Sequence, residues 1–331
     1  MIGALLSFYY LYVWLFISKK NSTKRRTTVK KNSGLLYGLS AYILWGFIPL
    51  YWKLMPNVGA VDVLFYRIIW SLVFMLIYMT VTRKIPVFLN ETKALLKNRK
   101  DILAITAAAI FISINWGVFI YTVNSGHVQQ GSLGYYINPL FNVLAAAVYL
   151  KEPLTRTAKI ATFCALIGVV LLTIQTGEFP WASIILAGSF CLYGLTKKQL
   201  DLSAITSITL ETMIITPIGL IYLFFFSEAG FLGYDTATNL LAMGAGIVTA
   251  IPLLLFANAA KRLSYVTLGF AQYINPTIML ALAVFLFHEP YGLSQFIAFS
   301  FIWLGILIFI IGNILQTKRV LKQPVKEIQP K

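Results

Sequence analysis

Charge is scarce in this 331-residue sequence: only 11% of its residues are charged, whereas 59% are hydrophobic. An ordinary soluble domain carries about a quarter charged residues, so the composition excludes that class and indicates an integral membrane protein. Histidine and cysteine are also rare, with two of each. Cys164 and Cys191 lack CxxC spacing and nearby histidines, so we expect no metal, no disulfide and no cofactor.

Catalytic and energy-transducing motifs are missing as well. HExxH, GxSxG and DxD do not occur, so we expect no enzyme and no catalytic residue. The GxxxxGK[ST] loop is absent too, which excludes ATP as the energy source within this chain. The bilayer is the first partner that the sequence predicts.

Acidic residues are few, 11 against 27 basic ones, which gives a net charge of +16. The basic residues lie almost wholly between apolar runs and carry no nucleic-acid-binding signature, so we expect no nucleic-acid partner. Instead, 25 of the 27 fall in alternate loops. Because basic residues near helix ends are retained in the cytoplasm, both ends of the helical body are predicted to face the cytoplasm, in the plasma membrane.

Ten apolar segments follow Ser33, each near the roughly 17–25 residues needed to cross a bilayer. Each should be a helix, because lipid-exposed backbone must bond internally. The segments are 34–53, 61–82, 102–123, 132–150, 159–175, 180–196, 205–227, 239–258, 265–287 and 293–315. The longest loop, 83–101, is predicted to form a short amphipathic helix on the membrane surface.

Residues 1–32 form an N-terminal apolar segment and a basic arm. The charge follows the apolar run 2–17, the reverse of a secretory signal. Two alternatives stay open: an extra helix with its N-terminus outside, or a start assigned too early. We favour the second, because Val29-Lys30-Lys31-Asn32 looks like the opening of a membrane protein.

An internal duplication organises the chain. Tyr136-Ile137-Asn138-Pro139 returns 137 positions later as Tyr273-Ile274-Asn275-Pro276, and the same shift pairs Gly168 with Gly305. We predict two five-helix repeats, 33–176 and 177–315, followed by a basic cytoplasmic tail, 316–331. Five helices per repeat place equivalent loops on opposite sides, so the repeats are predicted to be inverted, with an interrupted helix at each tetrapeptide.

Two charged residues lie well inside apolar segments. Arg67 is roughly 9 Å deep at 1.5 Å per residue, so it either snorkels or has a substrate or gating role. Glu211 lies at a similar depth from the other face, and a carboxyl group in a cavity could carry a coupling proton. A direct pair with Arg67 would need tilted or broken helices.

Polar and aromatic residues gather on the third, fourth, eighth and ninth segments. They predict a central cavity for an amphipathic or aromatic solute, although Asn can also be helix-packing glue. These candidates are Asn115, Trp116, Tyr121, Tyr135, Tyr136, Asn138, Pro139, Asn258, Gln272, Tyr273, Asn275 and Pro276. Trp45, Pro49 and Tyr51 are predicted to line its outer approach.

Several motifs resemble the EamA-type drug/metabolite transporters, and within them the RarD subgroup, from about Gly34 to Gly312. They are Ala41–Pro49 (AYILWGFIP), Tyr66–Ser71 (YRIIWS), Asn115-Trp116, Ser132–Pro139 (SLGYYINP) and Phe301–Leu304 (FIWL). The resemblance implies ten helices in two inverted five-helix repeats and export or exchange of small organic solutes. It does not supply the physiological substrate.

The sequence therefore predicts an all-α integral membrane protein that acts as a secondary transporter of a small organic metabolite or drug-like solute. The alternative is a channel or a receptor-like protein without coupled transport. A coupling proton and a homodimer are partner hypotheses that the sequence leaves open.

Overall fold

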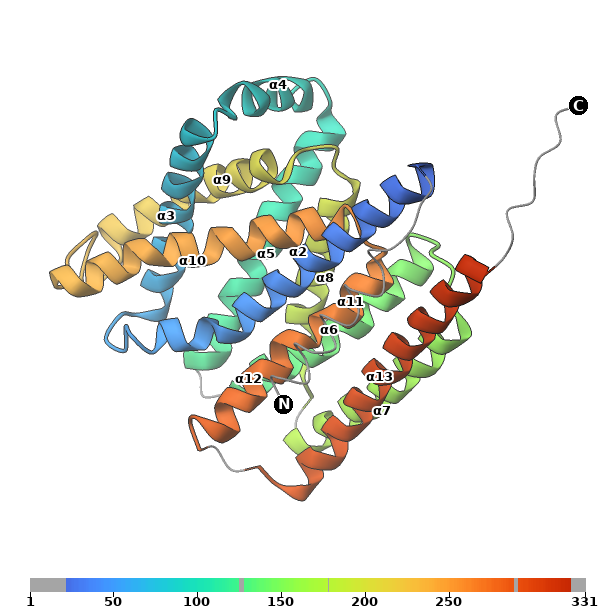
Figure 1. Ribbon diagram of the computed structural model, residues 1–331. Coiled ribbons are helices and arrows are strands. Elements are labelled where there is room, and N and C mark those ends of the chain that lie inside the picture. Colours follow the sequence, from blue (N-terminus) through green and yellow to red (C-terminus); the bar gives the residue numbers. More distant parts are fainter. Residues whose placement is uncertain (1–21, 125–127, 178, 289–290, 323–331) are drawn as a thin grey trace, which may run out of the picture.

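The computed structural model describes residues 22–124, 128–177, 179–288 and 291–322, and these ranges contain helices but no strand (Figure 1). The helices are α2 (Ser22–Trp52), α3 (Ala60–Val81), α4 (Ile85–Leu95), α5 (Arg99–Asn124), α6 (Val128–Val148), α7 (Arg156–Thr176), α8 (Trp181–Gln199), α9 (Ala204–Phe225), α10 (Thr236–Ala260), α11 (Tyr265–Gln272), α12 (Ile274–Phe285) and α13 (Leu293–Lys322).

Each of the ten predicted apolar segments contains a helix, and the predicted amphipathic helix is α4. Within the described residues, eight helices are long and apolar enough to cross a membrane; α11 and α12 together form one of them. Helices α2 and α13 run past the predicted limits, because hydropathy marks only the apolar part of a helix. The predicted N-terminal apolar run, 2–17, and most of the tail lie outside the described residues.

The two repeated tetrapeptides differ in structure. The second helix is interrupted at Tyr273, between α11 and α12, whereas α6 continues through Pro139. The prediction of an interrupted helix is therefore wrong for the first tetrapeptide. Pro276 lies in the first turn of α12, where a backbone N–H has no intrahelical acceptor, while Pro139 removes one bond inside α6 without ending the helix.

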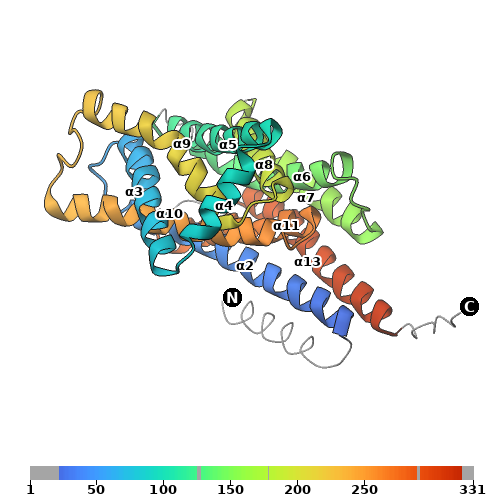
Figure 2. The same ribbon diagram turned by 90° about the horizontal axis from the view of Figure 1, so that it is seen from above.

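Helices far apart in the sequence pack against one another. The main pairs are α7 with α13, α6 with α8, α11 and α12, α2 with α10, α11 and α12, α3 with α9 and α10, and α5 with α8 and α9. Figure 1 shows α7 and α13 side by side along one edge. In Figure 2, α5 and α9 lie on the opposite side of the body from α2 and α13.

The α7–α13 crossing depends on two glycines. A Cβ added at Gly168 would lie 2.5 Å from the Ala298 carbonyl oxygen, and one added at Gly305 would lie 2.6 Å from the Ala161 carbonyl oxygen. The 137-residue shift that relates the two glycines also relates the two alanines. The two helices therefore approach each other through residues that the 137-residue shift relates.

Candidate functional site

Arg67 of α3 lies among aromatic rings from three other helices. Its guanidinium carbon is 3.8 Å from the ring centroid of Trp116 and 5.6 Å from that of Trp52. Tyr135 is close enough to interact with it electrostatically. We call Trp52, Arg67, Trp116 and Tyr135 the Arg67 group. The structure thus brings together three predicted site residues and adds Trp52, which the sequence analysis did not single out.

The Arg67 guanidinium forms no hydrogen bond or ion pair with any residue in the described ranges, and its Nε atom is buried without a partner. A distance of 3.8 Å is stacking contact, which a delocalised guanidinium tolerates better than an ammonium group. This contact uses none of the guanidinium N–H donors.

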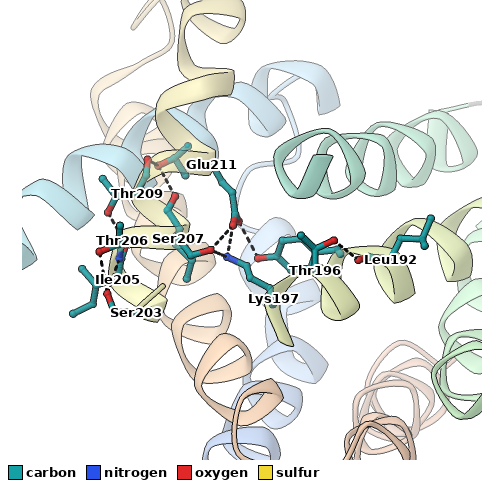
Figure 3. A network of polar contacts seen from close by, with 12 residues as sticks. Leu192, Thr196, Lys197, Ser203, Ile205, Thr206, Ser207, Thr209 and Glu211 are labelled. Carbon is teal, nitrogen blue, oxygen red and sulfur yellow. Dashed lines mark hydrogen bonds and ion pairs between the residues drawn. The ribbon is translucent and has the colours of Figure 1, made fainter. Parts of the chain in front are cut away.

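Glu211 does not pair with Arg67. It forms a buried ion pair with Lys197, and the two side chains are only 5% and 1% exposed. Its carboxylate also accepts hydrogen bonds from Ser207 Oγ at 2.9 Å and from the Tyr193 hydroxyl at 3.2 Å. Figure 3 shows Lys197 and Ser207 converging on the carboxylate.

A tight connection between α8 and α9 produces this pair. Helix α8 extends to Gln199, and α9 starts at Ala204 behind Ser203, whose Oγ accepts a hydrogen bond from the Thr206 amide at 3.3 Å. Lys197 therefore lies in the last turn of a helix and faces the first turns of the next. The sequence analysis counted it as a loop residue because the apolar segment ends at 196.

The repeated tetrapeptides meet where α6 crosses α11 and α12. The Tyr136 hydroxyl donates to the Pro276 carbonyl at 2.9 Å, and Asn142 Nδ2 donates to Gln272 Oε1 at 2.8 Å. Asn138 Nδ2 donates to the Ala187 carbonyl of α8 at 3.3 Å. Four of the predicted residues are therefore linked across the two halves or to a neighbouring helix.

Several buried polar atoms at this crossing have no partner among the described residues. They are the Tyr273 hydroxyl and the Oδ1 atoms of Asn138, Asn142 and Asn275. Buried polar groups are nearly always hydrogen-bonded to protein or to ordered water. These atoms at the crossing can therefore still accept or donate hydrogen bonds to water, to a solute or to another helix in a different arrangement.

Three other predicted residues are engaged elsewhere. Asn115 Nδ2 donates to the Leu186 carbonyl of α8 at 2.8 Å, and Asn258 Oδ1 accepts from Arg262 Nη1 at 2.6 Å. The ring of Tyr121 is half exposed and lies 5.7 Å from that of Trp181. Helix packing accounts for these contacts.

The predicted outer approach is also packed. The ring of Trp45 lies 5.7 Å from Phe190 and 5.6 Å from Phe256. The Tyr51 hydroxyl donates to the Leu241 carbonyl of α10 at 2.6 Å, and Pro49 lies inside α2. The role of Trp45, Pro49 and Tyr51 in solute entry stays a prediction.

A carboxylate that the sequence analysis overlooked fastens the 227–235 segment to α3. Asp62 Oδ2 accepts from Ser227 Oγ at 2.7 Å and from the Tyr234 hydroxyl at 2.6 Å. Burial and this hydrogen bond raise the pKa of Tyr234 to about 12. The Tyr66 hydroxyl accepts from the Leu232 amide at 2.6 Å. Helix α3 is thus fastened to the 227–235 segment through Asp62 and through Tyr66, the residue before Arg67.

Glu152 fastens the other end of the molecule. Both of its carboxylate oxygens accept from the Tyr265 amide at 2.9 Å, and Lys198 Nζ lies 3.7 Å away. A carboxylate at a helix N-terminus is stabilised by the helix dipole. Glu152 therefore holds the start of α11, the helix that precedes the break at Tyr273.

Comparison with known proteins relates this chain to a family. Residues 32–174 match the EamA-like transporter family. The chain is 44% identical to the uncharacterized transporter YojE of Bacillus subtilis, over 85% of this chain and 94% of that protein. It is 38% identical to the protein RarD of Escherichia coli, over 87% and 97%. A crystal structure with 17% identity matches the fold with a TM-score of 0.64, over 83% of this chain and 96% of its own.

Proposed function

Because the chain belongs to the EamA-like transporter family, and within it to the RarD subgroup, we propose that it is a secondary transporter of the plasma membrane. It exports or exchanges a small organic solute by alternating access. Relatives that span almost its whole helical body carry the word transporter in their names. A more distant relative, 25% identical, is named chloramphenicol-sensitive protein RarD, so drug-like solutes are included in the proposal.

The pattern of helix pairing supports ten membrane-spanning helices in two inverted repeats. One repeat consists of α2, α3, α5, α6 and α7, and the other of α8, α9, α10, α11/α12 and α13. If the repeats are exchanged, the α2–α10 contact corresponds to α8–α5, the α3–α10 contact to α9–α5, and the α6–α8 contact to that of α11/α12 with α2. All of these contacts occur. A two-fold axis in the membrane plane accounts for this correspondence.

The single observation that carries alternating access is a difference between equivalent residues. The Tyr136 hydroxyl donates to the Pro276 carbonyl, whereas the buried Tyr273 hydroxyl has no partner among the described residues. Likewise α6 is continuous, whereas α11 and α12 are separate. In inverted-repeat transporters the two access states involve movement of one repeat against the other. The opposite state is therefore expected to pair Tyr273 with the Pro139 carbonyl.

Replacing these tyrosines should shift the two access states in opposite directions. Tyr136→Phe removes a bond of the present state and Tyr273→Phe a bond of the other, each worth about 1 kcal/mol, or roughly a fivefold change in the ratio of states. Spin-label distances between cysteines introduced at Phe179 and Leu232 measure that ratio. Tyr149→Phe, on a ring that is 63% exposed, is the matched control. Shifts of the same sign in both variants would contradict the proposal.

Reconstitution in liposomes tests the transport function itself. Efflux of amino acids, aromatic metabolites and chloramphenicol is measured with and without a pH gradient. Saturable flux that rises when the same solute is added on the opposite side supports a transporter. Conductance far above carrier rates supports the channel alternative, and flux that follows the pH gradient supports a coupling proton.

Both ends of the helical body are proposed to lie in the cytoplasm, because the basic loops alternate with uncharged ones. A cysteine introduced at Pro290 is then expected to react with an impermeant maleimide added to intact cells. Cysteines introduced at Lys97 and Lys322 are expected to react only after the membrane is permeabilised. Labelling at position 97 in intact cells would overturn this topology.

A further inference from the structure

Arg67 is a cation deep in a helix without a counter-ion. The buried carboxylates in the described residues are committed elsewhere: Glu211 to Lys197, and Asp62 to Ser227 and Tyr234. The described residues form two ion pairs, Lys197–Glu211 and Lys198–Glu152, and neither includes Arg67. A guanidinium inside a bilayer is costly unless it is paired or hydrated. Its missing partner must therefore be water or a bound anion.

The aromatic neighbours of Arg67 favour a particular kind of anion. Trp116 lies 3.8 Å from the guanidinium carbon and uses none of its N–H donors, and the planar guanidinium can direct two parallel bonds to a carboxylate or phosphate. Tyr135 lies nearby, and its ring is 5.7 Å from that of Phe119. The surroundings of the guanidinium are therefore aromatic, which suits a solute with an apolar or aromatic body.

The other cations with described contacts in or near the helices do not offer this arrangement. Lys197 already has Glu211 as a partner. The ammonium group of Lys53 lies 3.1 Å from the ring centroid of Phe287, so an aromatic face covers it. Arg262 donates to its own helix neighbour Asn258. Among the cations discussed, Arg67 alone combines aromatic stacking with an edge that no described residue uses.

We propose that Arg67 is the anion-binding residue of the transport site and that the solute carries a carboxylate or phosphate on an aromatic or apolar body. The inference rests on the proposed transport function and names its substrate class. Bound solute supplies the negative charge that Arg67 lacks, and its body packs against Trp116 and Tyr135. Closure of the site around Arg67 is then easier with the anion present than without it.

Calorimetry on the purified full-length protein tests the proposal with three probes: phenylacetate, phenyl phosphate and the neutral phenylacetamide. In the wild type, at least one anion should bind about tenfold or more tightly than the amide, the range expected for charge-assisted hydrogen bonds. The stronger of the two anions identifies the preferred group. This comparison needs no variant, so it does not depend on how Arg67 substitutions fold.

Variants then assign the effect to the side chain. Arg67→Gln should reduce anion binding to the level of the amide, and Arg67→Lys should fall between, because it keeps the charge without the planar fork. Lys53→Gln is the matched control and should keep the wild-type preference. Melting temperatures of all variants identify any loss due to unfolding.

Equal affinity for anions and amide in the wild type, no binding of any of the three probes, or an equal effect of Lys53→Gln would overturn the proposal. Failure here is distinct from failure of the transport function. If solutes move through liposomes without any preference for anions, the transporter stands and the anion site falls. If anion binding depends on Arg67 but no solute moves, the anion site stands and the transport function falls.

Discussion

Lys197→Met is expected to remove most of the folded protein from the membrane. The substitution leaves the Glu211 carboxylate, 5% exposed, without its counter-charge. Breaking a buried pair from one side costs roughly 3–5 kcal/mol, a large part of the about 5–15 kcal/mol that stabilises a typical domain. The abundance of the protein in the membrane and its melting temperature in detergent measure the loss.

The neighbouring lysine supplies a matched control. Lys198 is 22% exposed, lies 3.7 Å from Glu152 and donates to the Leu263 carbonyl at 2.6 Å, so Lys198→Met should cost about 1–2 kcal/mol, less than Lys197→Met. The joint variant Lys197→Met/Glu211→Gln removes both charges and should recover most of the lost protein. A joint variant as unstable as Lys197→Met would show that the two residues do not act as a pair.

The single variant Glu211→Gln decides whether Glu211 carries a coupling proton. The sequence suggests that Glu211 titrates during transport, in which case Glu211→Gln keeps its fold and exchanges solute without responding to a pH gradient. The ion pair with Lys197 leads to a different expectation, because Glu211→Gln leaves a buried ammonium group unpaired. Loss of the protein from the membrane supports a fixed pair, and a stable exchanger supports the proton role.

Hydropathy was sufficient to predict the helices, because lipid leaves the backbone no partner except itself. It was not sufficient for Lys197, which lies one residue beyond the apolar segment yet belongs to the last turn of α8 and points inward. Counting basic residues by loop treats such a lysine as cytoplasmic. The direction of a side chain in a terminal turn depends on the neighbouring helix, here α9, and not on local composition.

The tetrapeptides illustrate a second limit of local sequence. Tyr136-Ile137-Asn138-Pro139 and its copy are identical, yet α6 is continuous and the helix of the copy is interrupted at Tyr273. Gly168 and Gly305, which the 137-residue shift relates, both lie at the contact between α7 and α13. Identical sequence therefore does not fix the helix conformation here, and the two copies have different neighbours: α6 packs against α8, and α12 packs against α2.

Gly168→Leu and Gly305→Leu are expected to destabilise the protein by similar amounts, because each places a side chain against a backbone carbonyl of the facing helix. The added Cβ atoms would lie 2.5 Å and 2.6 Å from the oxygens of Ala298 and Ala161. Overpacking of this kind costs about 1–3 kcal/mol, occasionally more, since backbone does not yield as a side chain does. Thermal unfolding in detergent measures the loss.

Gly117→Leu is the control, because a Cβ added there has no atom within 4 Å. The joint variant Gly168→Leu/Gly305→Leu should lose less than the sum of the single losses, because the first leucine already separates α7 from α13 and relieves the second clash. A large loss for one glycine and none for the other would mean that the two proposed repeats do not meet symmetrically at this crossing. Alternating access by exchange of the repeats would then lack its structural basis.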